Sequence, residues 1–113
     1  MQEQLIDRQL LEMAANAARI PLDGWNDGLE PYSSGVGFIV PSGRLWNPLT
    51  SDGDALQLAA QLRLRVLPGK HPGDGCTVES PQDGIAGCTA FYDDPAKQMR
   101  VAIVRVAAEM GKA

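Results

Sequence analysis

Few side chains in this 113-residue sequence have the type and spacing that a catalytic or metal site needs. His71 is the only histidine, and it lies in a glycine- and proline-rich segment typical of a loop rather than of a positioned general base. Cys76 and Cys88 stand apart without a second pair, which is not the ligand spacing of a zinc site. We therefore predict no catalytic residue, no metal site and no cofactor, and the residues do not identify an enzyme.

Two further segments come close to known ligand-binding patterns and fail at the positions that decide them. The segment 35–40 runs into an apolar strand pattern and has Val40 where a dinucleotide-binding motif requires its third glycine. The segment 23–28 resembles the start of a calcium loop, but Trp25 stands where a ligand is needed and Ser34 where the bidentate glutamate belongs. Neither pattern predicts a site.

The segment 46–56, WNPLTSDGDAL, places a tryptophan, a turn and a helix start close together. The proline after Asn47 ends the segment that carries Trp46, because a residue before proline is pushed out of the α region. Ser51 and Asp54 then have the spacing of a capping box that opens an apolar helix. This pattern explains how the segment folds and does not indicate a chemistry.

A partner-binding surface, if the protein has one, is expected around Trp25, Trp46, Asn47 and Asp54. Tryptophan is a frequent anchor of protein–protein contacts, and Trp25 lies in a polar segment. The alternative is that both tryptophans fold inward over the edge of a sheet, which the scarcity of other aromatic residues favours.

Hydrophobic periodicity and turn residues predict a single domain over residues 1–113 of α+β class, in the order α-β-β-α-β-β-β-α. The arrangement expected is a small antiparallel sheet of four to five strands flanked by three helices, similar to an α/β/α sandwich. The helices are predicted at 3–19, 52–62 and from Pro95, capped by Asp94, to Gly111. The strands are predicted at 37–40, 44–46, 63–67, 76–79 and 85–92, with a short extended piece near Trp25.

The same patterns predict which residues are buried. The expected buried stripes are Ile6, Leu10, Met13 and Ala17 in the first helix, Ala55, Leu56, Ala59 and Leu62 in the second, and Met99, Ala102, Ile103, Val106 and Met110 in the third. A hairpin that pairs Glu79 with Ile85 would place Cys76 opposite Cys88.

Charge and hydropathy restrict the classes of partner. The net charge is −4 and the Lys and Arg residues are dispersed, so nucleic-acid binding is disfavoured. It would require Arg63, Arg65, Arg100 and Arg105 to share one face. The sequence contains neither a signal peptide nor a segment apolar enough to span a bilayer, so we expect no membrane partner and a cytoplasmic protein with two reduced cysteines.

Two blocks resemble a known family. Residues 46–59, WNPLTSDGDALQLA, resemble the W-N-P-L-x-x-D-G-D-A-x-x-L segment of small phage and prophage proteins, and Asp94-Pro95 with 100–111 resembles their closing helix. The sequence is thus similar to the phage α-β-α (ABA) sandwich domain family, whose members are largely of unknown function. Residues 68–88 are longer and richer in cysteine and glycine than that family implies.

The resemblance implies a three-layer fold and a phage or prophage origin, and it transfers no catalytic residue. Our leading hypothesis is a non-enzymatic accessory protein that binds a host or phage protein. The alternative is a small-molecule-binding protein or minor enzyme with a pocket between sheet and helix, and nucleic-acid binding is the third possibility. The sequence predicts no oligomeric state.

Overall fold

A computed structural model describes residues 2–26, 36–68, 75–81, 86–89 and 94–111. The helices are α1 (Gln2–Ala18), α2 (Asp52–Leu62) and α3 (Pro95–Met110). The strands are β1 (Gly24–Asn26), β2 (Gly37–Ile39), β3 (Leu45–Trp46), β4 (Arg65–Leu67), β5 (Cys76–Glu79) and β6 (Ala86–Thr89). The predicted α+β class with three helices and antiparallel pairing is confirmed. None of the described helices is both long and apolar enough to cross a membrane.

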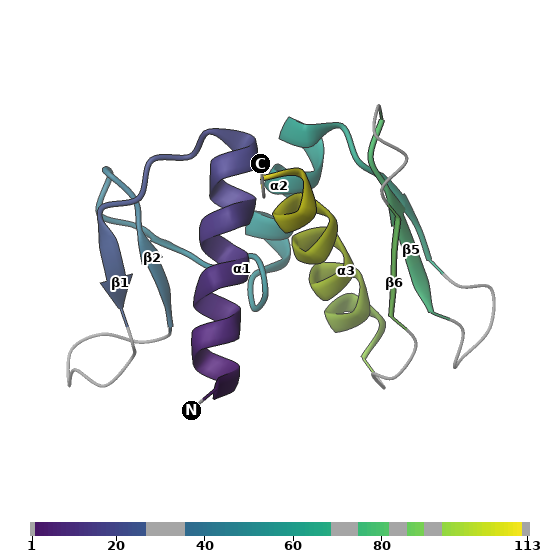
Figure 1. Ribbon diagram of the computed structural model, residues 1–113, viewed down its shortest axis with the longest axis horizontal. Coiled ribbons are helices and arrows are strands. Elements are labelled where there is room, and N and C mark those ends of the chain that lie inside the picture. Colours follow the sequence, from purple (N-terminus) through teal and green to yellow (C-terminus); the bar gives the residue numbers. More distant parts are fainter. Residues whose placement is uncertain (1, 27–35, 69–74, 82–85, 90–93, 112–113) are drawn as a thin grey trace.

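The strands form two sheets, and the helices lie between them (Figure 1). Sheet A has the order β1-β2-β3, and sheet B has the order β4-β5-β6, with every pair antiparallel. The prediction of one sheet of four to five strands with helices outside it is therefore wrong. The short piece expected near Trp25 is β1, which pairs with β2 and completes sheet A.

The reason for this layering is the C-terminal half of α3, which is buried on nearly every side. Its four consecutive residues Val101–Val104 are all buried, as are Val106, Ala107 and Ala108. A helix that is hydrophobic all round cannot form an outer layer and must be covered by other elements. Helices α1 and α2 and strands β5 and β6 all pack against α3, which makes it the centre of the fold.

Both predicted helix starts are confirmed in the structure. The Ser51 hydroxyl oxygen accepts the Asp54 N–H at 3.2 Å, and the Asp94 carboxylate accepts the Ala96 N–H at 3.0 Å, with Pro95 in the first turn. These contacts satisfy backbone donors that have no partner within the helix. Helix α2 ends at Arg63, whose left-handed conformation (φ 56°) turns the chain into β4.

The hairpins follow the predicted turns, with one error of register. Pro41–Gly43 joins β2 to β3 as predicted, and Gly43 adopts a positive φ of 87°. In the second hairpin, Cys76 pairs with Thr89 and Cys88 pairs with Thr77, so the prediction that the two cysteines are opposite one another is wrong. Glu79 pairs with Ala86 instead of Ile85, which moves the whole register by one residue, while residues 82–85 of the predicted turn lie outside the described residues.

Helices α1 and α3 pack closely against each other, and the buried face of α1 differs from the predicted one. The buried residues of α1 are Leu11, Ala14 and Ala15, whereas the predicted stripe residues Leu10 and Met13 are half-buried. Small alanines at the contact allow the two backbones to come together, so the buried face is rotated from the predicted one.

Gly111 marks the closest point of this contact. A Cβ atom at this position would lie 1.8 Å from the backbone oxygen of Met13, and the Asn16 side-chain amide donates a hydrogen bond to the Gly111 carbonyl at 2.9 Å. The Gly111 φ is −89°, so the glycine is required by the close approach of α1 and not by a left-handed helix cap.

We expect Gly111→Ala to lower the free energy of unfolding by about 3 kcal/mol, because the methyl group forces α1 and α3 apart. Urea unfolding followed by circular dichroism measures the change. Gly53→Ala is the matched control, since only the Ser51 hydroxyl lies near a Cβ built at that position of α2. Equal stabilities of the two variants would contradict the steric role of Gly111.

Candidate functional site

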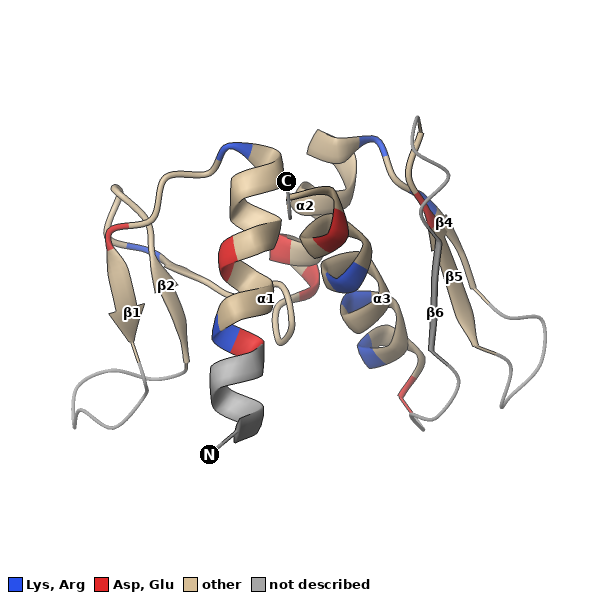
Figure 2. Cartoon of the chain, in the orientation of Figure 1, with Lys and Arg blue, Asp and Glu red and all other residues tan. Residues whose placement is uncertain are grey.

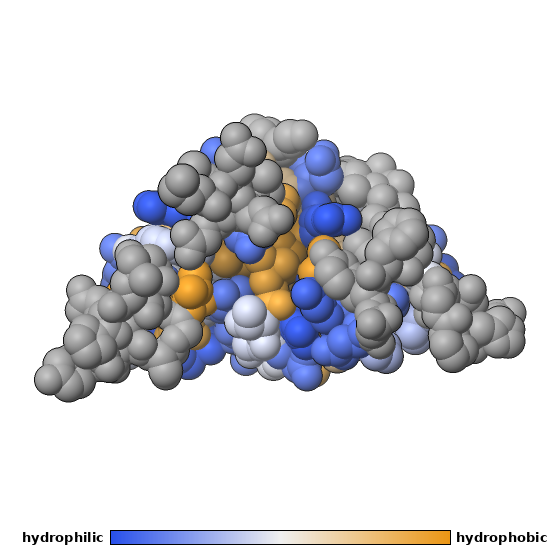
Figure 3. Space-filling model, turned by 90° about the horizontal axis from the view of Figure 1, so that it is seen from below, coloured by the Kyte–Doolittle hydropathy of each residue, from blue (hydrophilic) through white to orange (hydrophobic). Residues whose placement is uncertain are grey.

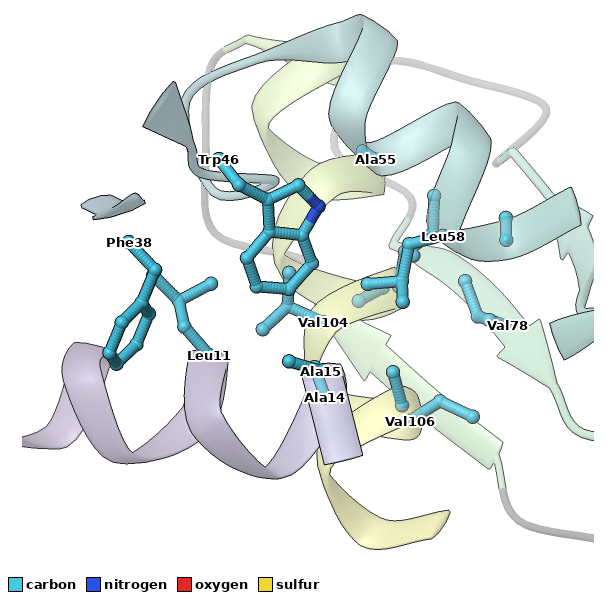
Figure 4. Close-up of a cluster of buried hydrophobic side chains, with 14 of the residues drawn as sticks. Leu11, Ala14, Ala15, Phe38, Trp46, Ala55, Leu58, Val78, Val104 and Val106 are labelled. Atoms are coloured by element: carbon cyan, nitrogen blue, oxygen red, sulfur yellow. The ribbon is translucent and has the colours of Figure 1, made fainter. Parts of the chain in front are cut away.

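Trp46 occupies the centre of the hydrophobic core. Its indole ring points from β3 toward Leu11 of α1, Val104 of α3 and Leu58 of α2, and the residue is 2% exposed (Figure 4). The register of sheet A pairs Phe38 with Trp46 and also with Trp25, so three aromatic side chains lie in a row on one face.

Trp25 is the outer member of this row and is half-buried. Its ring meets Phe38 edge to face, with centroids 4.9 Å apart at 71°. The Arg8 guanidinium carbon lies 5.6 Å from the Trp25 centroid, within reach of a cation–π interaction. Trp46 therefore folds inward, whereas Trp25 is half-buried and packs against the edge of the core over sheet A.

Asn47 connects three segments through its side chain and backbone. The side-chain amide donates to the Val36 carbonyl, the side-chain oxygen accepts the Leu49 N–H at 3.0 Å, and the backbone carbonyl accepts the Ser51 N–H at 2.9 Å. Gly37, beside Val36, has no room for a side chain, because a Cβ there would lie 2.6 Å from the Trp46 carbonyl oxygen. The Asn-Pro turn is thus held tightly against β2.

Asp54 completes this network from the first turn of α2. One carboxylate oxygen accepts the buried Asn47 N–H at 2.9 Å, and the other accepts the Arg44 guanidinium at 2.8 Å. Asp54 is 4% exposed, whereas the Arg44 side chain is about half exposed. In a full capping box this carboxylate would reach back to the Ser51 N–H, which here binds the Asn47 carbonyl instead.

The predicted partner surface is consequently wrong for three of its four residues. Trp46, Asn47 and Asp54 are all buried, and the side chains of Asn47 and Asp54 form hydrogen bonds within the chain. They share one structural unit because the S-x-x-D helix start follows so closely on the strand. The fourth residue, Trp25, is held by Phe38 and Arg8 and does not join them at a surface.

An open apolar groove lies elsewhere, between α2, α3 and β4. It has a volume of about 350 Å³. The lining residues are Asp52, Ala55, Leu56, Ala59, Val66, Ala96, Met99, Arg100 and Ile103. Its small alanines leave space beside the larger side chains, and the apolar lining fits an apolar ligand group.

Leu56 forms part of this groove and is 70% exposed, although the helical stripe predicts that it is buried. Leu58 takes the buried position instead, at 1% exposed. Residues two positions apart lie on different faces of a helix, and only the face of α2 that carries Leu58 packs into the core. This conflict was the one signal in the sequence that an apolar side chain of α2 remains at the surface.

The two charged residues of the groove bind each other. The Arg100 guanidinium donates to the Asp52 carboxylate at 2.6 Å and to the Leu49 carbonyl at 2.9 Å. These bonds tie α3 to the start of α2 and occupy an arginine that a nucleic-acid site would need. Basic residues lie along α3, while acidic residues gather at the start of α2 (Figure 2).

Apolar surface also appears at the end of the molecule where α1 begins. Figure 3 views this end and shows hydrophobic residues reaching the surface at its centre, with hydrophilic residues on either side. The side chain of Ile39, exposed at 36%, and that of Leu67, exposed at 39%, add smaller apolar areas on the sheets. Leu56 remains the most exposed of the large apolar residues described.

Within the described residues, no three His, Cys, Asp or Glu side chains gather where they could hold a metal ion. His71 and Cys88 carry no described side chain, and neither does the segment 27–35 that includes the end of the calcium-like pattern. No protein-family model matches the chain, and no curated protein or solved structure is similar to it.

We expect Asp54→Ala to lower the free energy of unfolding by about 3 kcal/mol, because it leaves the buried Asn47 N–H without an acceptor. Asp52→Ala is the matched control. It removes a carboxylate from the same helical turn, but this one is mostly exposed, so the loss should stay below about 1 kcal/mol. Urea unfolding of both variants gives the comparison, and similar losses would show that the buried contact adds no stability of its own.

Proposed function

We propose that this protein is a non-enzymatic accessory protein of phage or prophage origin that binds another protein through the groove between α2, α3 and β4. The origin rests on the resemblance of residues 46–59 to the phage α-β-α sandwich family. The binding role rests on one observation, the exposure of Leu56 at the groove. Leu56 and the apolar lining of the groove form one continuous apolar surface, and a continuous apolar surface is a feature of sites that a partner covers.

The arrangement of the groove supports this role. Its floor is formed by α2 and α3, which Arg100 ties together through Asp52 and Leu49, so the hollow is held open by contacts within the chain. A partner side chain entering a preformed site loses little free energy to reorganisation of the protein. The two charged lining residues, Asp52 and Arg100, bind each other, so a partner that covers the apolar floor leaves them hydrogen-bonded.

A second candidate function is the binding of a small apolar molecule in the same groove. The volume of about 350 Å³ lies at the lower end of the range of ligand sites, roughly 300–1,000 Å³. The groove also lies between a sheet and two helices, which is compatible with the alternative of a pocket between sheet and helix. A small ligand would raise the melting temperature of the purified protein, because it binds only the folded state.

The test is affinity capture with the purified chain from a lysate of the cells that carry the sequence. We expect Leu56→Glu to reduce the amount of captured protein by more than about tenfold, since partner binding would desolvate the new carboxylate against Met99 and Ile103. Gln57→Glu introduces the same charge at the next position of α2, exposed and outside the groove, and should retain it.

Both variants are first shown by urea unfolding to be as stable as the parent. Equal capture by the two variants would overturn the proposed site. If no protein is retained but apolar compounds raise the melting temperature of the parent and not of Leu56→Glu, the small-molecule function replaces the protein-binding one.

A further inference from the structure

Strand β4 is an edge of sheet B and borders the groove. It pairs with β5 through Arg65–Glu79, Val66–Val78 and Leu67–Thr77, and no other described strand pairs with it. An edge strand directs part of its N–H and C=O groups away from the sheet, where they can pair with another chain.

The two faces of β4 differ in what they offer a neighbouring strand. Val66 pairs with the buried Val78 and lines the groove, so its face of the strand is the inner one. Arg65 and Leu67 are exposed and, by the alternation of a strand, lie on the outer face. A strand added about 4.8 Å beyond β4 would therefore pass along the groove, with alternate side chains directed toward α2 and α3.

Charge indicates what the outer side chains of such a strand would be. Arg65 and Arg63 are both exposed, and neither forms an ion pair with another described residue. In the sheet, Arg65 already stands opposite the acidic Glu79 of β5. Residues of opposite charge in directly opposed positions stabilise strand pairing, so the complementary residue on the free side of Arg65 is again acidic.

We propose that an extended segment of the partner adds to β4 as a fourth strand of sheet B, with an apolar residue opposite Val66 and an acidic residue opposite Arg65. The inner side chains of the segment fill the groove beside Leu56, and its backbone pairs with the free edge of β4. This inference rests on the proposed function, because it names the partner chemistry of the same groove. It explains why the groove lies at a sheet edge and why that edge carries two exposed arginines that form no ion pair with another described residue.

The experiment is selection of short random peptides from a displayed library against the purified full chain. We expect the enriched peptides to alternate apolar with polar positions and to carry Asp or Glu at polar ones. Apolar residues at helical spacing, or no enriched peptide, would overturn strand addition.

A synthetic copy of the most enriched peptide then tests the contact with Arg65. We expect Arg65→Glu to weaken binding of this peptide at least tenfold. A peptide with lysine in place of the acidic residue should restore binding to the Arg65→Glu variant. Arg105→Glu, an exposed arginine of α3 outside the groove, should leave binding unchanged. Hydrogen exchange of the complex should show new protection of β4 amides, which a side-chain contact alone would not give.

The outcomes separate the two proposals. If Leu56→Glu abolishes peptide binding but charge exchange at Arg65 and β4 protection are absent, the groove binds partners and strand addition is wrong. If neither Leu56→Glu nor Arg65→Glu affects binding, both proposals are wrong.

Discussion

The fold depends on a buried carboxylate that joins sheet A to the helical layer. Asp54 reaches back from the first turn of α2 and binds the Asn47 N–H directly after β3, while Arg44 holds its second oxygen. Asn47 in turn binds the Val36 carbonyl beside β2. The crossing from sheet A to α2, made by these contacts of Asp54 and Asn47, fixes the position of α2 relative to Trp46, because Asp54 and Asn47 are buried and loss of one partner leaves another unsatisfied.

The groove follows from that crossing together with the burial of α3. Residues 101–104 and 106–108 of α3 are buried, and the helix is covered by α1 with sheet A on one side and by sheet B on the other (Figure 1). Helix α2 contributes its alanine face to α3, and β4, which follows α2 directly in the chain, ends sheet B beside it. Between α2 and β4 the side chains of Ala55 and Ala59 are too small to fill the space, so the surface is hollow and apolar there.

Local signals in the sequence predicted the elements well, and contacts distant in sequence account for most of the errors. Asp94-Pro95 and Ser51 located two helix starts, and the Pro-Ser-Gly turn located a hairpin, because these residues act on their own backbone. The division into two sheets depends on which elements pack around α3, and no local sequence pattern predicts that packing. Asp54 was placed correctly in a helix start but was assigned to a surface. The two donors to its carboxylate, the Asn47 N–H and the Arg44 guanidinium, lie before the helix, and no local pattern predicts that the fold brings them to it. The sequence suggested a pocket between sheet and helix only as part of an alternative function, and it predicted none of the residues that line the groove.

The most direct test of the central contact is native-state hydrogen exchange of the Asn47 amide, measured by NMR alongside an amide in the middle of α3 such as that of Val104. If Asp54 holds the crossing as the structure indicates, the Asn47 amide exchanges only when the whole protein unfolds, and its free energy of opening equals that of Val104. An opening free energy for Asn47 far below the global value would contradict the account, because the crossing would then open while the core stays folded.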